Sequence, residues 1–278
     1  MIKLGSFNSF KKDSNYLFGA AKEAIENGAN TMMIYLGAPQ TTLRTDVSNY
    51  RLLDYEMEYM HLIPKEDIVV HAPYVINPAN PTKANYSCDF LIKEIQRMNY
   101  IGNKYLVLHP GAFTTYSAQE ALDTLVDSLK YIISETEDVV ICLETMAGKG
   151  TEICRNLEQI KYVLDWVKSD RVQICLDTCH LWDAGYNLKN YQEFKNTLIK
   201  YDLLKNVKVI HLNDSKNELN SHKDRHENIG RGFIGFETLQ KFVFDPDFDN
   251  VPIILETPFI GNKSPYKEEI AMLLNKKN

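Results

Sequence analysis

The stretch Val139-Val140-Ile141-Cys142-Leu143-Glu144 places five apolar residues in a row before a single carboxylate. A short apolar run without polar alternation is typical of a parallel strand that is covered on both faces. Comparable runs recur along the chain, and together with this one they number eight. They occupy residues 2–4, 31–36, 68–70, 105–108, 139–143, 172–176, 207–212 and 251–255.

Successive runs start 29 to 44 residues apart, which leaves room for one strand, one helix and two loops in each interval. We expect one helix over residues 14–27, with Asp13 or Ser14 as its N-cap and Gly28 as its terminator. A second should follow the capping box that starts at Ser117 and extend to residue 132. Eight βα units without a linker predict a single α/β domain over residues 1–278, a closed (β/α)8 TIM barrel. An open doubly wound sheet is the alternative, and Pro252 weakens the eighth strand.

The composition, with 44% hydrophobic and 24% charged residues, is that of a folded globular protein. Five scattered cysteines without a Cys-x-x-Cys pair favour a reducing compartment. Neither a signal-peptide pattern nor an apolar run of the roughly 20 residues needed to span a bilayer is present, so we expect a cytoplasmic protein with no membrane partner. The formal net charge of −6 argues against a nucleic-acid partner, because phosphate binding usually leaves an excess of Lys and Arg.

The residues that end the apolar runs share one chemistry. In a TIM barrel the active site lies where the strands end. The third to sixth and the eighth runs are followed directly by His71, His109, Glu144, Asp177 and Glu256, and His211 lies at the end of the seventh. One histidine in such a place is usually structural, but six metal-ligand side chains on consecutive strands predict a metal centre. Clustered carboxylates would repel one another unless a cation lay among them.

Two segments add further candidate ligands. His180 follows the sixth run closely, and Asp224 and His226 lie in a long loop over residues 213–235, a length that is usually functional. Imidazoles and carboxylates without thiolate favour zinc or manganese over magnesium and calcium, and we expect zinc. Nine side chains cannot close three tetrahedral sites, so open, catalytic positions remain. His61 and His222 are predicted to be ordinary surface residues, and Cys142 and Cys175 buried apolar fillers.

The motifs around these residues resemble those of the endonuclease IV family. The segments Leu176-Asp177-Thr178-Cys179-His180, His211-Leu212-Asn213-Asp214-Ser215 and Asp224-Arg225-His226-Glu227-Asn228-Ile229-Gly230 look like its signatures. Residues 71–74, 109–111, 143–148 and 255–258 are similar to its other blocks, so that the resemblance spans the chain.

The resemblance implies an enzyme that binds damaged duplex DNA and hydrolyses the phosphodiester bond 5′ to an abasic site, leaving 3′-hydroxyl and 5′-deoxyribose phosphate ends. It also implies trimming of 3′ blocking groups. We also expect a monomer. Three zinc ions are implied, with Glu144 bridging two of them and orienting a metal-bound hydroxide that attacks the phosphate. Their six positive charges, all at the rim, would offset the net charge of −6 locally. The implied sets are His71, His109 and Glu144; Glu144, Asp177, His211 and Glu256; and His180, Asp224 and His226.

Lesion recognition is implied for the loops after the second and third runs. Gln40, in the segment 37–40, and Tyr74 with Val75 occupy the matching places and are the expected DNA contacts. Arg44 is a further candidate for insertion into DNA, and a solvated surface arginine is the other interpretation.

Two rival functions remain. The first is a divalent-metal sugar isomerase or epimerase on a related barrel, which would need only Glu144, Asp177, His211 and Glu256. It leaves the other five candidate ligands unexplained. The second is a zinc-binding protein without enzymatic activity, which would show closed metal sites.

Overall fold

A closed parallel barrel of eight strands forms the centre of the protein. The computed structural model describes residues 1–275, and in it the strands pair in the order β1-β10-β7-β6-β5-β4-β3-β2 and close on themselves. They are β1 (Lys3–Phe7), β2 (Thr31–Ile34), β3 (Ile68–His71), β4 (Tyr105–Leu108), β5 (Val140–Glu144), β6 (Val172–Asp177), β7 (Val207–His211) and β10 (Pro252–Leu255). The predicted TIM barrel is confirmed, and the open-sheet alternative is wrong. The predicted domain bounds 1–278 extend into residues 276–278, which lie outside the described residues.

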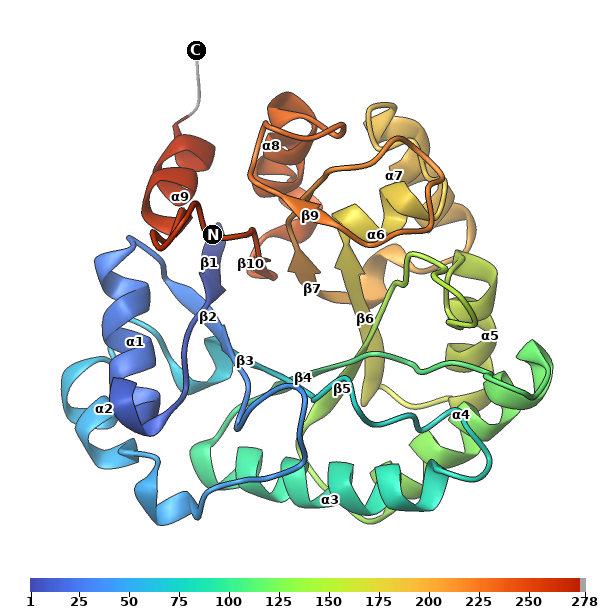
Figure 1. The fold of residues 1–278 in the computed structure, drawn as a ribbon, viewed down its shortest axis with the longest axis horizontal. Coiled ribbons are helices and arrows are strands. Elements are labelled where there is room, and N and C mark those ends of the chain that lie inside the picture. The colour runs from blue at the N-terminus through green and yellow to red at the C-terminus, as the bar shows by residue number, and fades with distance from the viewer. Residues whose placement is uncertain (276–278) are drawn as a thin grey trace.

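Helices surround the barrel (Figure 1). They are α1 (Tyr16–Glu26), α2 (Leu52–Glu58), α3 (Ala84–Ile101), α4 (Ala118–Ser134), α5 (Leu157–Val167), α6 (Thr178–Asp183), α7 (Tyr191–Lys200), α8 (Phe236–Phe244) and α9 (Tyr266–Leu274). Short 3-10 turns cover Lys12–Ser14, Val47–Asn49, Lys65–Asp67, Leu204–Asn206 and Pro246–Phe248. Within residues 1–275, no helix has the length and apolar character needed to cross a membrane.

The two helices predicted in detail differ in how well their starts were placed. At α4 the capping box is present, because the Ser117 hydroxyl accepts the Glu120 N–H and the Glu120 carboxylate accepts the Ser117 N–H. At α1 the predicted N-cap is wrong, since Asn15 occupies that position in a left-handed conformation. The Ser14 hydroxyl donates instead to the carbonyls of Ser9 and Lys11, which holds the preceding 3-10 turn.

A layer of apolar side chains fills the inside of the barrel. The members of this layer are Met33, Val69, Val107, Cys142, Cys175, Val209 and Ile254, and all seven are fully buried. The prediction that Cys142 and Cys175 are buried fillers is confirmed. Side chains two apart on a strand point to the same face. The residues two positions further along therefore also face the barrel interior, at the rim: Tyr35, His71, His109, Glu144, Asp177, His211 and Glu256.

The segment over residues 213–235 is less irregular than predicted. It contains a two-stranded antiparallel sheet of β8 (Asp214–Ser215) and β9 (His226–Glu227). The buried Asp214 carboxylate accepts backbone N–H groups from Gly230, Gly232, Ile234 and Gly235, which folds the end of the segment around it. The sheet brings His226 back over the rim of the barrel.

Candidate metal centre

Glu144 lies at the centre of a group of four imidazoles. Its Oε2 atom is 3.1 Å from Nε2 of His71 and 3.1 Å from Nε2 of His109. Its other oxygen, Oε1, is 3.0 Å from Nδ1 of His211 and 3.4 Å from Nδ1 of His180. The carboxylate is almost completely buried at the end of β5. Its two oxygens face different sides of the cluster, so that one side chain can serve two adjacent cation positions.

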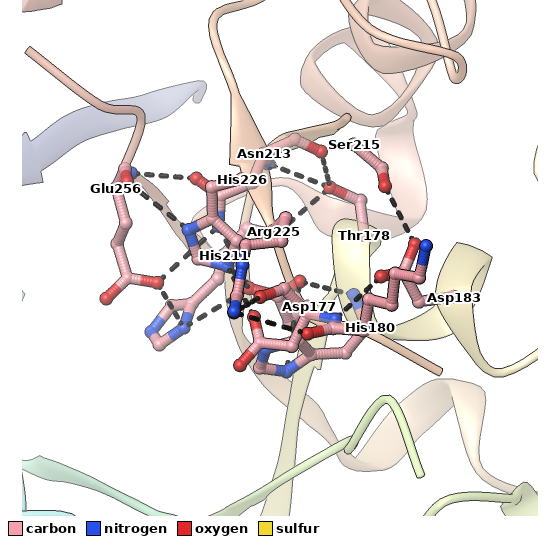
Figure 2. Close-up of polar contacts among 12 residues, drawn as sticks. Asp177, Thr178, His180, Asp183, His211, Asn213, Ser215, Arg225, His226 and Glu256 are labelled. Carbon is pink, nitrogen blue, oxygen red and sulfur yellow. Dashed lines mark hydrogen bonds and ion pairs between the residues drawn. The ribbon is translucent and has the colours of Figure 1, made fainter. Parts of the chain in front are cut away.

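A second group forms around His211 at the ends of β6, β7 and β10. The His211 Nδ1 atom is 3.0 Å from Glu256 Oε2 and 3.9 Å from Asp177 Oδ2. Asn213 contacts both carboxylates (Figure 2), because its Nδ2 donates to Asp177 at 2.9 Å and to Glu256 Oε2 at 3.5 Å, and its Oδ1 accepts the Glu256 backbone N–H at 2.9 Å. The sequence prediction did not assign a role to Asn213, although it falls within one of the family-like motifs.

A third group joins α6 to the segment over residues 213–235. The Asp177 side chain caps α6 by accepting the His180 N–H at 2.8 Å, which turns the His180 ring toward the rim. His180 Nε2 then lies 3.0 Å from Asp224 Oδ1. His226 Nε2 is 3.5 Å from the same oxygen and 3.7 Å from Asp177 Oδ2. All nine predicted ligands are therefore brought together at one end of the barrel.

The electrostatics of the cluster are dominated by mutual neutralisation. Burial opposes ionisation of Glu144, but the neighbouring His211 and His109 hold its pKa well below the usual range. Burial also opposes a charged His180, yet the carboxylates of Asp177 and Asp224 raise its pKa well above the usual value. For Asp177 burial prevails and raises the pKa. Protons on these imidazoles must leave before a metal can bind, so that metal loading is coupled to proton release.

The cluster fits divalent metal better than it fits hydrogen bonds alone. Among residues 1–275, the buried His226 Nε2 has no hydrogen-bond partner. Tetrahedral zinc with ligands at about 2.1 Å would separate neighbouring ligand atoms by about 3.4 Å. The carboxylate oxygens at 3.5 and 3.7 Å from His226 Nε2 are close to that spacing. Ligand atoms also converge in the sets Glu144, Asp177, His211, Glu256 and His180, Asp224, His226.

Cys179 lies near this cluster but is a poor ligand. Its sulfur converges with Asp177 and His226. Burial, reinforced by the charge of Asp177, raises the pKa of the Cys179 thiol far above its usual range. A metal binds the thiolate rather than the thiol. The expectation of a centre built from imidazoles and carboxylates therefore remains the better one.

Tyr35 is a rim residue that the sequence prediction missed. It stacks on the His71 ring, with the centroids 4.8 Å apart. Burial, assisted by the charges of Glu256 and Glu144, raises the pKa of the Tyr35 hydroxyl well above its usual value. The spacing rule that relates Cys142 to Glu144 also relates Met33 to Tyr35, so this position could have been found from the strand pattern.

The expected DNA contacts lie on two adjacent loops. Tyr74 and Val75 are 54% and 44% exposed, although both are large apolar side chains. Gln40 is exposed on the loop after β2. The Tyr74 N–H donates to the Pro39 carbonyl at 3.2 Å and so ties the two loops together. All three residues are exposed on these loops, and their contact with DNA stays a prediction.

Both interpretations of Arg44 are wrong. Its side chain is 1% exposed, and its Nε lies 2.8 Å from Oε1 of the buried Glu94 on α3. The guanidinium also lies over the Phe90 ring, 4.9 Å from its centroid. This buried ion pair anchors the loop after β2 to α3 and leaves Arg44 unable to enter DNA.

The two remaining histidines are on the surface, as predicted. His61 is exposed. His222 is exposed as well, but its Nδ1 lies 2.8 Å from the carbonyl of Ala147 and links two rim loops.

Comparison with known proteins agrees with this geometry. Residues 21–276 match the family model described as xylose isomerase-like TIM barrel. A protein of Mycoplasmopsis synoviae (strain 53) named "Probable endonuclease 4" is 69% identical over 277 residues, which cover 100% of this chain and 100% of that protein.

Two solved structures share the fold. The crystal structure of endonuclease IV from Thermus thermophilus matches with a TM-score of 0.82 and 24% identity over 99% of this chain and 100% of that chain. A D-tagatose 3-epimerase-like protein matches with a TM-score of 0.72 and 20% identity, over 98% and 96% of the two chains. At such identities these matches show the barrel alone. The full-length sequence match decides the question: the chain belongs to the endonuclease 4 family.

Proposed function

We propose that this member of the family is a DNA-repair enzyme that hydrolyses the phosphodiester bond 5′ to abasic sites in duplex DNA. Its products would be 3′-hydroxyl and 5′-deoxyribose phosphate ends, and it would also trim blocked 3′ ends. The observation that carries the proposal is the convergence of nine imidazole and carboxylate side chains around Glu144 at one barrel rim. Hydrolysis of an unactivated phosphodiester needs strong stabilisation of negative charge, which such a centre can provide.

We assign the residues to three zinc positions. His71, His109 and Glu144 would hold the first; Glu144, Asp177, His211 and Glu256 the second; and His180, Asp224 and His226 the third. When bound, zinc supplies Lewis acidity, which lowers the pKa of water and stabilises charge on phosphate oxygens.

The protein side chains have separate roles around this chemistry. Glu144 presents one oxygen to His71 and the other to His211, and the same carboxylate can orient an attacking water. Asn213 helps to hold Asp177 and Glu256, through a bond to the first carboxylate and through bonds to the carboxylate and the backbone N–H of the second. Tyr35, stacked on His71, shields one side of the cluster from water. A fixed, largely buried centre costs little reorganisation during the reaction.

Substrate selection is assigned to the loops that carry Gln40, Tyr74 and Val75. Their side chains are exposed, and in this proposal they enter a gap in the base stack. An abasic nucleotide has no base to unstack, so it is extruded at lower cost than a paired nucleotide. We also propose a monomer in the cytoplasm, a compartment that agrees with five free cysteine thiols.

The sugar isomerase alternative uses fewer of the observed contacts. It accounts for Glu144, Asp177, His211 and Glu256, but not for the five other side chains that reach the same cluster. The incision test uses a duplex oligonucleotide with a tetrahydrofuran abasic analogue and no added magnesium. The analogue has no aldehyde, so β-elimination cannot cut it. We expect incision on its 5′ side and a product that a polymerase extends. An intact duplex together with ketose–aldose interconversion would favour the isomerase.

A further inference from the structure

The segment that carries Asp224 has an unusual backbone. Asn220, His222 and Asp224 all have positive φ angles, of 67°, 55° and 54°. Non-glycine residues rarely adopt this left-handed region, and each costs free energy that the surroundings must offset. Three such residues at alternate positions require a specific partner to hold the segment in place.

That partner is the C-terminal end of α6. The Asn220 N–H donates to the Trp182 carbonyl at 3.1 Å, and the His222 N–H donates to the Asp183 carbonyl at 3.0 Å. The Asp224 N–H donates to the Asp183 carboxylate at 2.8 Å. Each of the three strained residues is therefore bound through its own amide.

Asp183 is the side chain in this arrangement that reaches Asp224. It is fully buried. Its Oδ1 accepts the Ser215 hydroxyl at 2.7 Å (Figure 2), and its Oδ2 accepts an Asn217 amide N–H at 3.3 Å besides that of Asp224. Three donors from three different residues thus fix the carboxylate, which in turn fixes the backbone at Asp224.

The same helix also supplies the partner of the Asp224 side chain. His180 lies one turn before Asp183 in α6, and its Nε2 is 3.0 Å from Asp224 Oδ1. One helix therefore contacts Asp224 twice, at the side chain through His180 and at the backbone through Asp183. The candidate ligands at the ends of β3 to β7 and β10 lie on the barrel strands, outside the strained stretch over residues 220–224.

We propose that Asp183 is a positioning residue for the third metal position: it holds the strained backbone so that the Asp224 carboxylate faces His180. This inference rests on the proposed function in taking Asp224 as a ligand. Substitution of a residue that contacts and orients a metal ligand typically changes metal affinity by about 10- to 100-fold. The effect should fall on one metal, while the positions built on strand ends keep their affinity.

A general loss of stability could imitate this effect, so a matched control is needed. Asp245 is also a buried carboxylate that accepts several donors, from Lys195 and Tyr191. It contacts neither the metal centre nor the segment over residues 213–235 through these bonds. Asp245→Ala should lower stability without changing metal affinity.

The test compares wild type, Asp183→Ala, Asp183→Asn and Asp245→Ala as metal-free proteins titrated with zinc against a chelator. For Asp183→Ala we expect one zinc to bind about 10- to 100-fold more weakly and the others as in wild type. Asp183→Asn should lie between, because its amide oxygen can still accept the Asp224 N–H and its NH2 can donate to Ser215. Hydrogen exchange of the metal-free proteins over residues 216–226 should be fastest in Asp183→Ala, intermediate in Asp183→Asn, and the same as wild type in Asp245→Ala.

Unchanged affinity for every zinc, together with unchanged exchange in Asp183→Ala, would overturn the proposal. If Asp183→Ala does not fold, Asp183→Asn decides on the same two readouts. No DNA is used, so failure of incision does not affect the result. Wild-type protein that binds a single metal would instead contradict the proposed function, while the exchange measurement would still report on Asp183.

Discussion

The Glu144 carboxylate and the His211 imidazole lie 3.0 Å apart, both fully enclosed, directly above the apolar layer that fills the barrel. Glu144 follows Cys142 by two residues on β5, and His211 follows Val209 by two on β7. The strand period that buries the two apolar residues therefore also turns the carboxylate and the imidazole toward each other. The alternation of side chains along the strands thus places both the apolar layer and the candidate metal ligands.

Glu144→Gln should abolish most of the activity without unfolding the protein. The amide side chain keeps the shape of the carboxylate but lacks the negative charge that lies next to His71, His109 and His211. We expect single-turnover incision at an abasic site to fall by about three orders of magnitude or more, as for loss of a main electrostatic contributor. Thermal unfolding should remain cooperative. Glu135→Gln, on the exposed end of α4, is the control and should behave as wild type. Near-normal incision by Glu144→Gln would show that the central role is wrong.

The double variant Tyr74→Ala, Val75→Ala should lose lesion recognition and keep its stability. Both side chains are about half exposed and add little to the core. We expect weaker binding of abasic duplex, by about 10-fold or more if stacking contacts of about 1–3 kcal/mol per base are lost. Binding of an undamaged duplex should change little. Gel-shift titrations of the two duplexes measure the difference, and equal losses on both would contradict a role in recognising the lesion.

The pH dependence of stability should reveal the Asp245 contact. Burial opposes ionisation of Asp245, but hydrogen bonds from Lys195 and Tyr191 lower its pKa below the usual value for an aspartate. A depressed pKa in the folded state stabilises the protein above the unfolded-state pKa, and this contribution is lost as the pH falls through the folded-state pKa. Asp245→Asn should therefore destabilise the metal-free protein by about 1.5–3 kcal/mol at pH 7, as for hydrogen bonds to a charged group.

The difference between wild type and Asp245→Asn should narrow as the pH drops below about 4. Urea unfolding of both proteins at several pH values measures it. A constant difference down to the acid-unfolding limit would show that the Asp245 charge contributes nothing.

The sequence could predict the barrel and six of the ligands because both follow from one repeated pattern. Each apolar run ends at the rim. The residue type at the end of each run, from His71 to Glu256, therefore identifies the candidate ligands. His180, Asp224 and His226 were predicted instead from their place just after the sixth run and in the long loop over residues 213–235, since no strand period governs a loop. Asp183 was missed because its role depends on a segment about 40 residues away that only the folded chain brings to α6.

Arg44 is a second residue whose surroundings could not be predicted from the sequence. A lone arginine in a polar loop is usually solvated, and only the contact with Glu94 on α3, 50 residues away, reveals that it is buried. The start of α1 was misplaced for a local reason, because Ser14 bonds backwards to Ser9 and not forward into the helix. Patterns in a single sequence do not reveal long-range packing or competing local hydrogen bonds.

The metal content of the native protein tests the central claim most directly. Nine ligand side chains in three converging sets at one rim predict three divalent ions per chain, chiefly zinc. Elemental analysis of protein purified without chelator, referred to an accurate protein concentration, measures this number. A value close to three zinc ions per chain is the predicted result. A single ion per chain, or mainly magnesium, would contradict the trinuclear centre and leave a barrel with the metal content of a sugar isomerase.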